Sequence, residues 1–459
     1  MDLRSARQRV VVIGGGMAGA RLAQALGAAG AAPGAGAAVD LTVVGEESHA
    51  PYNRVLLADV LAGRYAPDVV ALPASRARWL RGVRAVRIDR AERRVVCDDG
   101  GVLPYDTLVL ATGANPVLPP LRGLFTPGGG ELPDGVRAFR TMDDCLALHA
   151  EVRPGIPAVV VGGGLLGVSA ARALARRGAQ VVLAHQGERL MERQLDAASA
   201  ELLRRHLEEL GVEVHTECRV RGLLTGPADE RTSEAGGART ARPGGGHDSR
   251  PQAPATRTRP QGPRAVHAVQ LADGHALDAR LVVLACGVRP RTGLAEAAGL
   301  TVSRGVVVDD RLRTSDPRIH AVGDCAEHRG VLYGLAGPAQ EQADALARVI
   351  ADGSAAAAYG GTRSLTRLTL AGGEGARQPL DLAAFGDPLP REDDDVVSLT
   401  DATRGVHRKV VVRDDRLVGG ILLGDLAAVG TLARTYETGE TLPPEPLLHL
   451  LTHDGEALR

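Results

Sequence analysis

Cysteine is scarce in this chain of 459 residues, and its spacing is uninformative for thiol chemistry. No two cysteines are spaced as CxxC or CxxxxC. The sequence therefore supports neither a disulfide framework, nor a four-thiolate metal cluster, nor a dithiol active site. The five cysteines are Cys97, Cys145, Cys218, Cys286 and Cys325.

An excess of charge and a long apolar run are missing as well. The formal net charge is −1 and Lys409 is the only lysine, so bulk electrostatics favours neither nucleic acid nor an anionic membrane as a partner. No apolar run reaches the length that spans a membrane. The N-terminus, MDLRSARQRVVVIGGG, has no signal-peptide layout. We therefore expect a cytoplasmic location.

Two pairs of residues have the spacing of metal ligands but lack the rest of a site. Cys325 and His328 have no second ligand pair nearby, so they are expected to begin a helix rather than to bind a metal. His449 and His453 stand in HLLTH, which lacks the glutamate of the zinc-hydrolase motif HExxH. Cys97 and Cys145 are expected to be small buried residues. No metal site is predicted.

Apolar strands alternate with helical stretches over most of the chain, which is typical of α/β proteins with parallel sheets. After about residue 355 the pattern changes, and KVVVRDDRLVGGILL (409–423) predicts two strands around a tight polar turn. The earlier strands are expected at DLTVV (40–44), TLVLATGA (107–114), QVVLA (180–184), RLVVLACG (280–287) and IHAVGD (319–324).

Two strand–glycine–helix segments, VVVIGGGMAGARLAQAL (10–26) and VVVGGGLLGVSAARAL (159–174), predict two Rossmann-like dinucleotide-binding domains, which are followed by a small α+β C-terminal domain. Residues 225–264 have almost no large apolar side chains, so they predict a disordered insert. A basic interaction tail is the alternative. A smaller Ala/Gly insertion occupies residues 31–38. The predicted domains are 1–140 with a return segment 285–352, then 141–284, which carries the insert 225–264, and finally 353–459.

Two glycine turns are the main evidence for dinucleotide binding. Each follows a strand and opens a helix, which is the context that the GxGxxG fingerprint requires. The first glycine permits the tight turn, the second lets the backbone approach a pyrophosphate, and the third lets helix and strand pack closely. The helix N-terminus then presents free N–H groups to the phosphates. The two sets are Gly14, Gly16 and Gly19, and Gly162, Gly164 and Gly167.

The residues after the second strand of each unit differ. An acid there is expected to bind the adenosine ribose. Glu46 and Glu47 stand at this place in the first unit, whereas the second unit reads LAHQGER, with His185 and no acid at the strand end. Neither strand end is clearly built for the 2′-phosphate of NADPH, but Arg189 follows the second one closely enough that both NADH and NADPH stay candidates. The two sites are therefore predicted to hold different cofactors.

A flavin in one site could take hydride from a nicotinamide in the other and release electrons singly. The flavin would need the chain to return to its domain, and IHAVGDCAEH suits such a return. Asp324 at that strand end could hydrogen-bond the ribityl chain of a flavin. The alternative is that Asp324 is the N-cap of the next helix.

Together these elements resemble the two-dinucleotide-binding flavoprotein oxidoreductases over roughly residues 8–352. The resemblance rests on both fingerprints and on LVLATGA, LACGVRP and AVGD in the expected order. More specifically, PYNRVLLADVLAG (51–63), RLMERQLDAA (189–198), GDCAEHRGVLYGLAGPAQEQA (323–343) and KVVVRDDRLVGGILLGD are similar to two families. These are the flavoprotein portion of NAD(P)H-dependent assimilatory nitrite reductase and the electron-transfer subunit of assimilatory nitrate reductase.

The resemblance implies FAD in the first site and NADH or NADPH in the second. Several relatives have Ser-Lys after the segment that matches Arg54, whereas this chain has Leu57, Ala58 and Asp59. The residues implied for FAD are Gly14, Gly15, Gly16, Met17, Ala18, Gly19, Glu46 or Glu47, Arg54, Thr112, Gly113, Gly323 and Asp324. Those implied for NAD(P)H are Gly162, Gly164, Leu165, Leu166, Gly167 and His185, with Gly287 near the nicotinamide.

The implied function is an NAD(P)H-dependent FAD oxidoreductase that passes electrons to a partner. The partner would be a nitrate or nitrite reductase catalytic subunit, or an iron–sulfur protein. No side chain is expected to act as a nucleophile, and no cysteine follows residue 424 to ligate an iron–sulfur cluster or siroheme. The alternatives are a ferredoxin- or rubredoxin-type reductase, an NADH oxidase and, outside enzymes, a flavin-based redox sensor.

Overall fold

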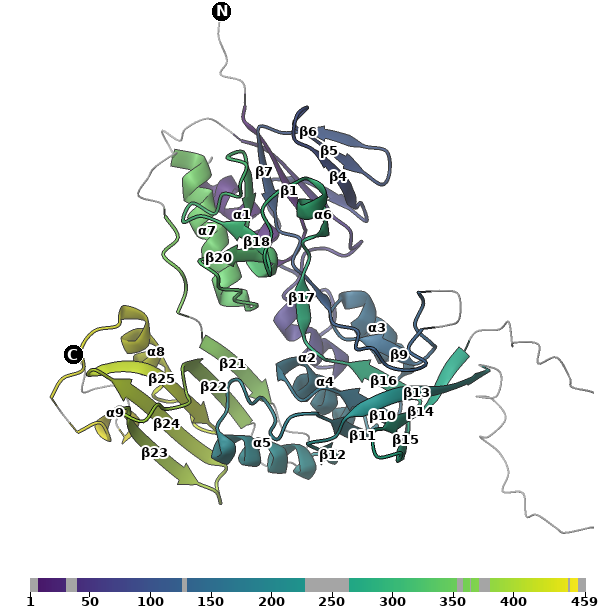
Figure 1. Ribbon diagram of the computed structural model, residues 1–459, viewed down its shortest axis with the longest axis vertical. Coiled ribbons are helices and arrows are strands. Elements are labelled where there is room, and N and C mark those ends of the chain that lie inside the picture. Colours follow the sequence, from purple (N-terminus) through teal and green to yellow (C-terminus); the bar gives the residue numbers. More distant parts are fainter. Residues whose placement is uncertain are drawn as a thin grey trace, which may run out of the picture.

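A computed structural model describes eight stretches of the chain (Figure 1), and the insertion predicted at 31–38 lies outside them. The insert predicted at 225–264 lies outside them too, except at its ends. Its first three residues and its last residue belong to two paired antiparallel strands, in which Pro227 faces Arg264. The described stretches are 7–29, 39–125, 130–227, 264–352, 358–363, 365–370, 380–444 and 446–452.

The first unit is a parallel five-stranded sheet with the order β19-β7-β1-β2-β3. Strands such as β1 and β7 are almost entirely buried and apolar, as expected where helices cover both faces of a parallel sheet. The helices α1 and α7 pack against each other and share the core of this sheet. The bounds are β1 (Arg9–Ile13), α1 (Met17–Ala29), β2 (Asp40–Gly45), β3 (Arg78–Arg81), β7 (Thr107–Leu110), β19 (Ile319–Ala321) and α7 (Ala336–Asp352).

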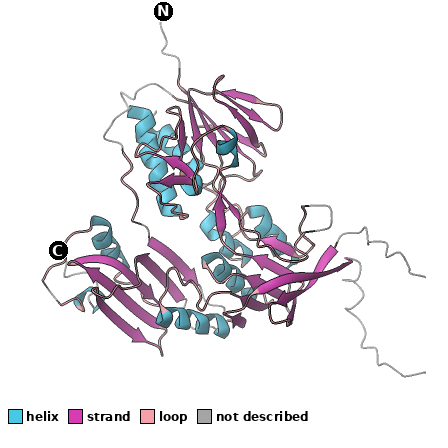
Figure 2. Cartoon of the chain, in the orientation of Figure 1, coloured by secondary structure: helices cyan, strands magenta, loops and turns pink. Residues whose placement is uncertain are grey.

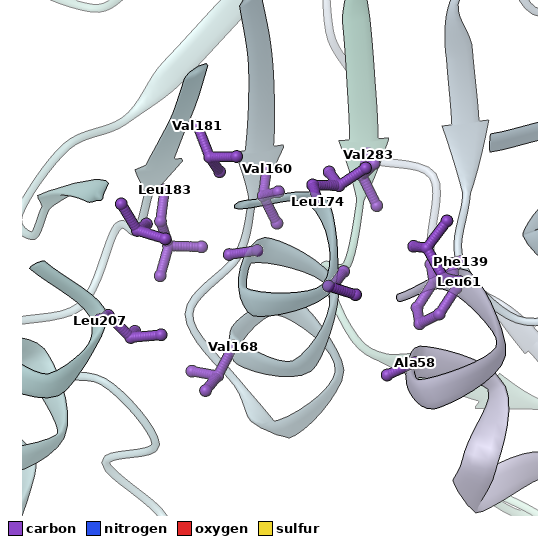
Figure 3. Packing of buried hydrophobic residues seen from close by; sticks show 14 of the residues in the cluster. Ala58, Leu61, Phe139, Val160, Val168, Leu174, Val181, Leu183, Leu207 and Val283 are labelled. Carbon is purple, nitrogen blue, oxygen red and sulfur yellow. The ribbon is translucent and has the colours of Figure 1, made fainter. Parts of the chain in front are cut away.

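The second unit repeats this architecture with the parallel order β12-β11-β10-β16-β9. Figure 3 shows Val160, Val181 and Leu183 of its strands facing Val168 and Leu174 of α4, and all five are fully buried or nearly so. The bounds are β9 (Val136–Ala138), α3 (Met142–Glu151), β10 (Pro157–Val161), α4 (Leu165–Arg176), β11 (Gln180–Ala184), α5 (Ala197–Glu209), β12 (Val212–His215) and β16 (Leu281–Leu284).

Smaller elements surround the two units (Figure 2). The strands β8 and β17, which follow β7 and β16, form an antiparallel pair that joins the two units. The remaining elements are β4 (Ala85–Asp89), β5 (Arg94–Cys97) and β6 (Val102–Pro104) in one sheet, β13 (Val220–Pro227), β14 (Arg264–Leu271) and β15 (Ala276–Asp278) in another, β8 (Ala114–Pro116) with β17 (Val288–Pro290), β18 (Val306–Val308) with β20 (Ala326–His328), α6 (Gly293–Ala297) and the 3-10 turn η3 (Gly323–Cys325).

The segment after β2 packs away from its own sheet. The turn η1 (Arg54–Leu56) and the helix α2 (Leu57–Leu61) lie against α3 and α4 of the second unit, and Figure 3 shows Leu61 beside Phe139. Arg172 of α4 donates from Nη2 to Asp59 Oδ1 at 3.0 Å, and its side chain is only 2% exposed. This buried ion pair ties the first segment of the chain to the second unit.

The described part of the C-terminal region forms an antiparallel sheet with two short helices, as expected for a small α+β domain. Asp414 and Asp415 adopt φ of 50° and 55° in the turn between β24 and β25, which is the conformation that two-residue hairpin turns favour. The sheet order is β21-β22-β25-β24-β23. The bounds are β21 (Leu365–Leu370), β22 (Leu380–Gly386), β23 (Asp395–Asp401), β24 (Val406–Arg413), β25 (Arg416–Leu423), α8 (Val429–Thr438) and α9 (His449–Thr452).

The lone lysine joins this sheet to the second unit. Lys409 of β24 is buried, and its Nζ lies 3.1 Å from Asp196 Oδ2 at the N-cap of α5. Burial alone would raise the pKa of Asp196, but the contact with His407 and the hydrogen bonds from Ser199 lower it below its ordinary value. Asp196 is therefore held as a carboxylate opposite the lysine.

Candidate functional site

The first glycine turn has the geometry that its fingerprint predicts. Gly14 follows β1 with φ of +121°, and an added Cβ would lie 2.5 Å from the carbonyl carbon of Ala111. A Cβ on Gly19 would overlap the carbonyl oxygen of Gly14, so this glycine allows close helix packing. A Cβ on Gly16 would meet nothing within 4 Å. The first turn of α1, which begins at Met17, holds no acidic residue, so the space beside Gly16 suits a phosphate.

The second glycine turn repeats these contacts. Gly162 follows β10 with φ of +112°, and a Cβ there would lie 2.8 Å from the carbonyl carbon of Ala285. A Cβ on Gly167 would overlap the carbonyl oxygen of Gly162, whereas a Cβ on Gly164 would again meet open space. Gly164 is the N-cap of α4 and makes no side-chain capping bond, so the first N–H groups of Leu165 and Leu166 stay open to a ligand.

Hydrogen bonds give the exact correspondence between the two units. Gly14 N donates to Val44 O at 2.8 Å, and Gly162 N donates to Ala184 O at 2.8 Å. Val44 therefore corresponds to Ala184, and the residues that follow β2 correspond one by one to those that follow β11. Glu47 of the first unit and Gly187 of the second unit therefore occupy equivalent positions.

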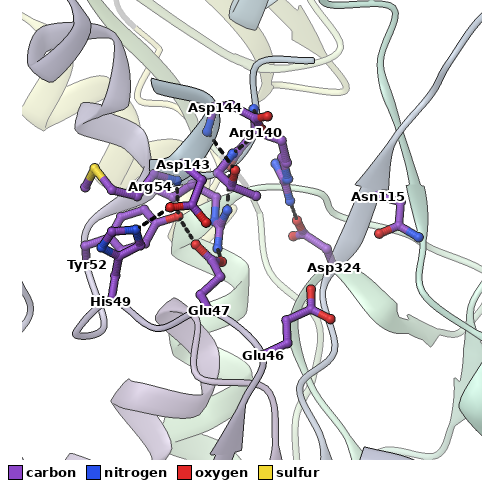
Figure 4. Close-up of polar contacts among 12 residues, drawn as sticks. Glu46, Glu47, His49, Tyr52, Arg54, Asn115, Arg140, Asp143, Asp144 and Asp324 are labelled. Carbon is purple, nitrogen blue, oxygen red and sulfur yellow. Dashed lines mark hydrogen bonds and ion pairs between the residues drawn. The ribbon is translucent and has the colours of Figure 1, made fainter. Parts of the chain in front are cut away.

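The two glutamates that were alternatives for the ribose have different surroundings (Figure 4). Glu47 accepts hydrogen bonds from Arg54 Nη2 and from the Tyr52 hydroxyl, each at 2.7 Å. Burial would raise the pKa of Glu47, but the charge of Arg54 and these hydrogen bonds lower it below its ordinary value. Glu46 pairs with Arg291 and is 40% exposed. Glu46 is thus the glutamate whose carboxylate remains accessible.

The return segment lies against the first glycine turn. A Cβ on Gly323 would approach the Cβ of Ala18 to 3.1 Å, and Gly323 N donates to the buried Gln342 at 2.7 Å. Asp324 Oδ2 lies 2.6 Å from Arg140 Nη2, and both side chains are less than a fifth exposed. Arg54 in turn donates to the carbonyl of Arg140, and Figure 4 shows the three side chains in one group.

Two interpretations of this segment are wrong, namely the alternative role of Asp324 as an N-cap and the helix expected at Cys325 and His328. Asp324 lies inside η3, whose N-cap is Val322. Cys325 is the last residue of this 3-10 turn and His328 is the last residue of the strand β20, so the two residues do not begin an α-helix. The strand forms because β20 pairs in parallel with β18, a partner that the local sequence does not reveal. Cys325 is fully buried, and burial raises the pKa of its thiol.

Thr112 and Gly113 lie where the chain crosses between the units. Thr112 Oγ1 donates to Arg291 O at 2.9 Å, and Arg291 N donates to Gly113 O at 2.9 Å. Gly113 and Gly287 follow the equivalent strands β7 and β16 with φ of 72° and 95°. Gly113, implied for FAD, and Gly287, implied for the nicotinamide, thus both occupy left-handed turns that an L side chain disfavours.

His185 of the second unit contacts the glycine turn through its ring. Its Nδ1 accepts from Gly163 N at 3.1 Å, so the ring lies on the glycine turn itself. Sequence reasoning missed Arg140, Tyr52 and Arg291 as partners of the predicted acids. Tyr52 had a signal in the PYNR segment, whereas Arg140 is 184 residues from Asp324 and had none.

Several other residues singled out by the sequence can be placed in the structure. Within the described residues no group of three or more His, Cys, Asp and Glu side chains could hold a metal ion, and His453 lies outside them. Cys97 and Cys145 are buried as predicted, and burial raises the pKa of Cys145 to about 12. Over the same part of the chain, no helix is long and apolar enough to cross a membrane.

Comparisons with known proteins agree with this geometry. Residues 8–237 and 249–343 match the family described as pyridine nucleotide-disulphide oxidoreductase. Residues 379–439 match the family described as rubredoxin NAD+ reductase C-terminal domain. A solved putidaredoxin reductase–putidaredoxin complex superposes with a TM-score of 0.78 at 24% identity, covering 97% of this chain and 99% of that chain.

Two similar curated proteins come from Bacillus subtilis. One is an NAD(P)H nitrite reductase, 32% identical over 91% of this chain and 46% of its own length. The other is an assimilatory nitrate reductase electron transfer subunit, 33% identical over 91% of this chain and 48% of its own length. The chain thus spans about half the length of these relatives.

Proposed function

Because the chain belongs to the pyridine nucleotide-disulphide oxidoreductase family, we propose that it is an FAD-dependent enzyme that takes hydride from NAD(P)H and passes electrons to a partner protein. The observation that carries the proposal is the duplicated unit. The same strand–glycine–helix geometry occurs twice, with the same backbone bonds, but with different residues after the second strand. Two dinucleotides of different kinds fit such a pair.

In this proposal the segments 1–140 and 285–352 hold FAD. The first helix turn and Gly16 would face the pyrophosphate, Glu46 would bind the ribose, and Asp324 would hold the ribityl chain. Arg54, Thr112, Gly113 and Gly323 would complete the site. When bound, FAD accepts hydride and returns electrons one at a time. The protein contributes position, because Arg140 and Gln342 hold the return segment against the first glycine turn.

The segment 141–284 would hold NAD(P)H. Gly162, Gly164 and Gly167 would shape the pyrophosphate site at the start of α4, as they do in the first unit. His185 would support the turn through its bond to Gly163, and Gly287 would lie near the nicotinamide. The segment 353–459 follows as the C-terminal domain. We propose a cytoplasmic location, in line with the assimilatory role named for the relatives.

For the partner we propose a nitrate or nitrite reductase that carries the final redox centres. The support is the naming of the two Bacillus relatives and their similarity across 91% of this chain. The second candidate is that this chain is a ferredoxin- or rubredoxin-type reductase, whose partner would be an iron–sulfur protein. The match of residues 379–439 favours it. The two candidates differ only in the acceptor and share the hydride step.

Anaerobic stopped-flow spectroscopy tests the proposal. NADH or NADPH should bleach the visible flavin absorption, and ferricyanide should restore it. Nitrate or nitrite alone should not restore it, whereas either anion should do so once its purified reductase is added. Failure of both coenzymes to bleach the flavin would contradict the hydride step. Direct reoxidation by either anion would contradict the need for a partner.

Replacing Asp324 with alanine is expected to weaken FAD retention. The change removes a charge-assisted hydrogen bond, which is worth roughly 1.5–3 kcal/mol, and leaves Arg140 without the carboxylate that lies 2.6 Å away. The FAD dissociation constant of reconstituted protein should rise about tenfold to a hundredfold. Asp344→Ala is the matched control, because it breaks the more exposed pair with Arg21 on α1. Unchanged FAD affinity in the Asp324 variant would contradict the ribityl assignment.

A further inference from the structure

We propose that Glu192 supplies the acid that is missing at the end of β11 and thereby makes NADH, rather than NADPH, the coenzyme. The inference rests on the proposed function, because it assumes that the second unit binds a nicotinamide coenzyme. It deepens that function by naming a specificity residue that the strand-end sequence LAHQGER does not contain.

The position of the missing acid follows from the correspondence between the units. Since Val44 corresponds to Ala184, Glu46 corresponds to Gln186 and Glu47 to Gly187. Neither residue of the second unit carries a charge. A coenzyme ribose placed here as in the first unit would therefore meet no acid from the strand itself.

Glu192 brings a carboxylate to this strand end from the following turn, over the residue that comes directly after Gln186, the counterpart of Glu46. An added Cβ on Gly187 would lie 2.6 Å from Glu192 Oε2 and would overlap Oε1 as well, so the carboxylate lies directly over Gly187. Glu192 Oε1 is also 3.9 Å from His185 Nε2. The side chain of Glu192 is 44% exposed, which leaves its carboxylate open to a ligand.

Backbone contacts with the glycine turn fix this placement. Met191 N donates to Gly163 O at 2.9 Å, and Met191 adopts φ of +51°. Leu190 is buried with its Cδ2 against Gly163, 2.7 Å from where a Cβ would stand. The residue that precedes Glu192 is therefore bonded to the same turn that would hold the pyrophosphate.

A carboxylate at this place distinguishes the two coenzymes. It can accept hydrogen bonds from the ribose hydroxyls of NADH, whereas the 2′-phosphate of NADPH would bring like charge next to it. Arg189 is the cation that could favour a phosphate, but its Nη1 lies 4.0 Å from the carboxylate of Glu188. The turn from 188 to 193 holds two acids and two arginines, so the placement of Glu192 decides the preference.

The test measures flavin reduction by NADH and NADPH, together with equilibrium binding of NAD+ and NADP+ to the holoenzyme. The wild type should prefer NADH by at least about tenfold. Glu192→Gln should lower kcat/KM for NADH by roughly tenfold to a hundredfold, mainly through KM, and should leave NADPH unchanged or better. Glu192→Asp should recover part of the preference.

Two further variants separate specificity from structure. Gly187→Ala should shift the preference in the same direction, because its Cβ displaces the carboxylate without removing it, and Gly187 has no positive φ that alanine would strain. Glu213→Gln removes an equal charge from an exposed side chain on the neighbouring strand β12 and should leave the preference unchanged.

Two results would overturn the assignment: a wild type that prefers NADPH, or a Glu192→Gln variant that loses both coenzymes equally. If neither coenzyme reduces the flavin, the proposed function fails, but the binding of NAD+ against NADP+ still tests Glu192.

Discussion

Replacing Gly14 with alanine is expected to destabilise the first unit by about 3 kcal/mol or more. Gly14 has φ of +121°, which an L side chain rarely adopts, and the added Cβ would lie 2.5 Å from the carbonyl carbon of Ala111. The atoms that the Cβ would approach belong to the backbone of Ala111 and Thr112, directly after the paired strand β7. They cannot shift without disturbing that strand. The variant should lose FAD and unfold at a lower urea concentration, as followed by circular dichroism and flavin absorbance.

Gly16→Ala is the matched control for Gly14. Its Cβ would meet no atom within 4 Å, and Gly16 has no positive φ. The apoprotein should therefore be about as stable as the wild type, but FAD should bind more weakly because the methyl group enters the space assigned to the pyrophosphate. A Gly14→Ala protein with full stability and full flavin content would show that the turn is not as the structure describes it.

Asp59→Ala is expected to cost about 3–5 kcal/mol, since breaking a buried ion pair leaves an uncompensated charge. Arg172 would remain in an apolar core with a side chain only 2% exposed. Its Nε and Nη1 already lack hydrogen-bond partners among the described residues. The free energy of unfolding from urea titration measures the loss, and the rate of flavin reduction shows whether the packing of α2 on α4 also matters for hydride transfer.

A double replacement distinguishes a lost charge partner from a lost helix contact. Asp59→Leu together with Arg172→Met removes both charges and should recover most of the stability, because paired apolar side chains often replace a buried ion pair at no cost. Glu201→Ala breaks exposed pairs with Arg204 and Arg205 on α5 and should cost less than about 1 kcal/mol. Equal losses in the single and double variants would contradict the charge explanation.

The glycine turns, the strands around them and the C-terminal hairpin could be predicted because their causes are local. Gly14, Gly19 and the apolar residues of β1 stand within a dozen positions of one another. The tight turn at Asp414 and Asp415 likewise depends on two adjacent residues between two apolar runs. The expected helix after Asp324 was wrong because β20 forms only through its pairing with β18.

The choice between Glu46 and Glu47 needed the tertiary structure. The two residues are adjacent and chemically identical, so only their surroundings distinguish them. Glu47 is held by Tyr52 and Arg54, whereas Glu46 pairs with Arg291, which is 245 residues away in the chain. No periodicity or motif reports such a contact.

The sequence by itself determined that two strand–glycine–helix units are present and that the residues after their second strands differ. The tertiary structure alone decided which charges meet, namely Asp324 with Arg140 and Asp59 with Arg172. It also decided that the carboxylate of Glu192 lies over Gly187. The physical reason is range. Backbone conformation and apolar periodicity depend on neighbours a few residues apart, whereas an ion pair depends only on distance in space. Asp59 and Arg172 are 113 residues apart in the chain and 3.0 Å apart in the fold.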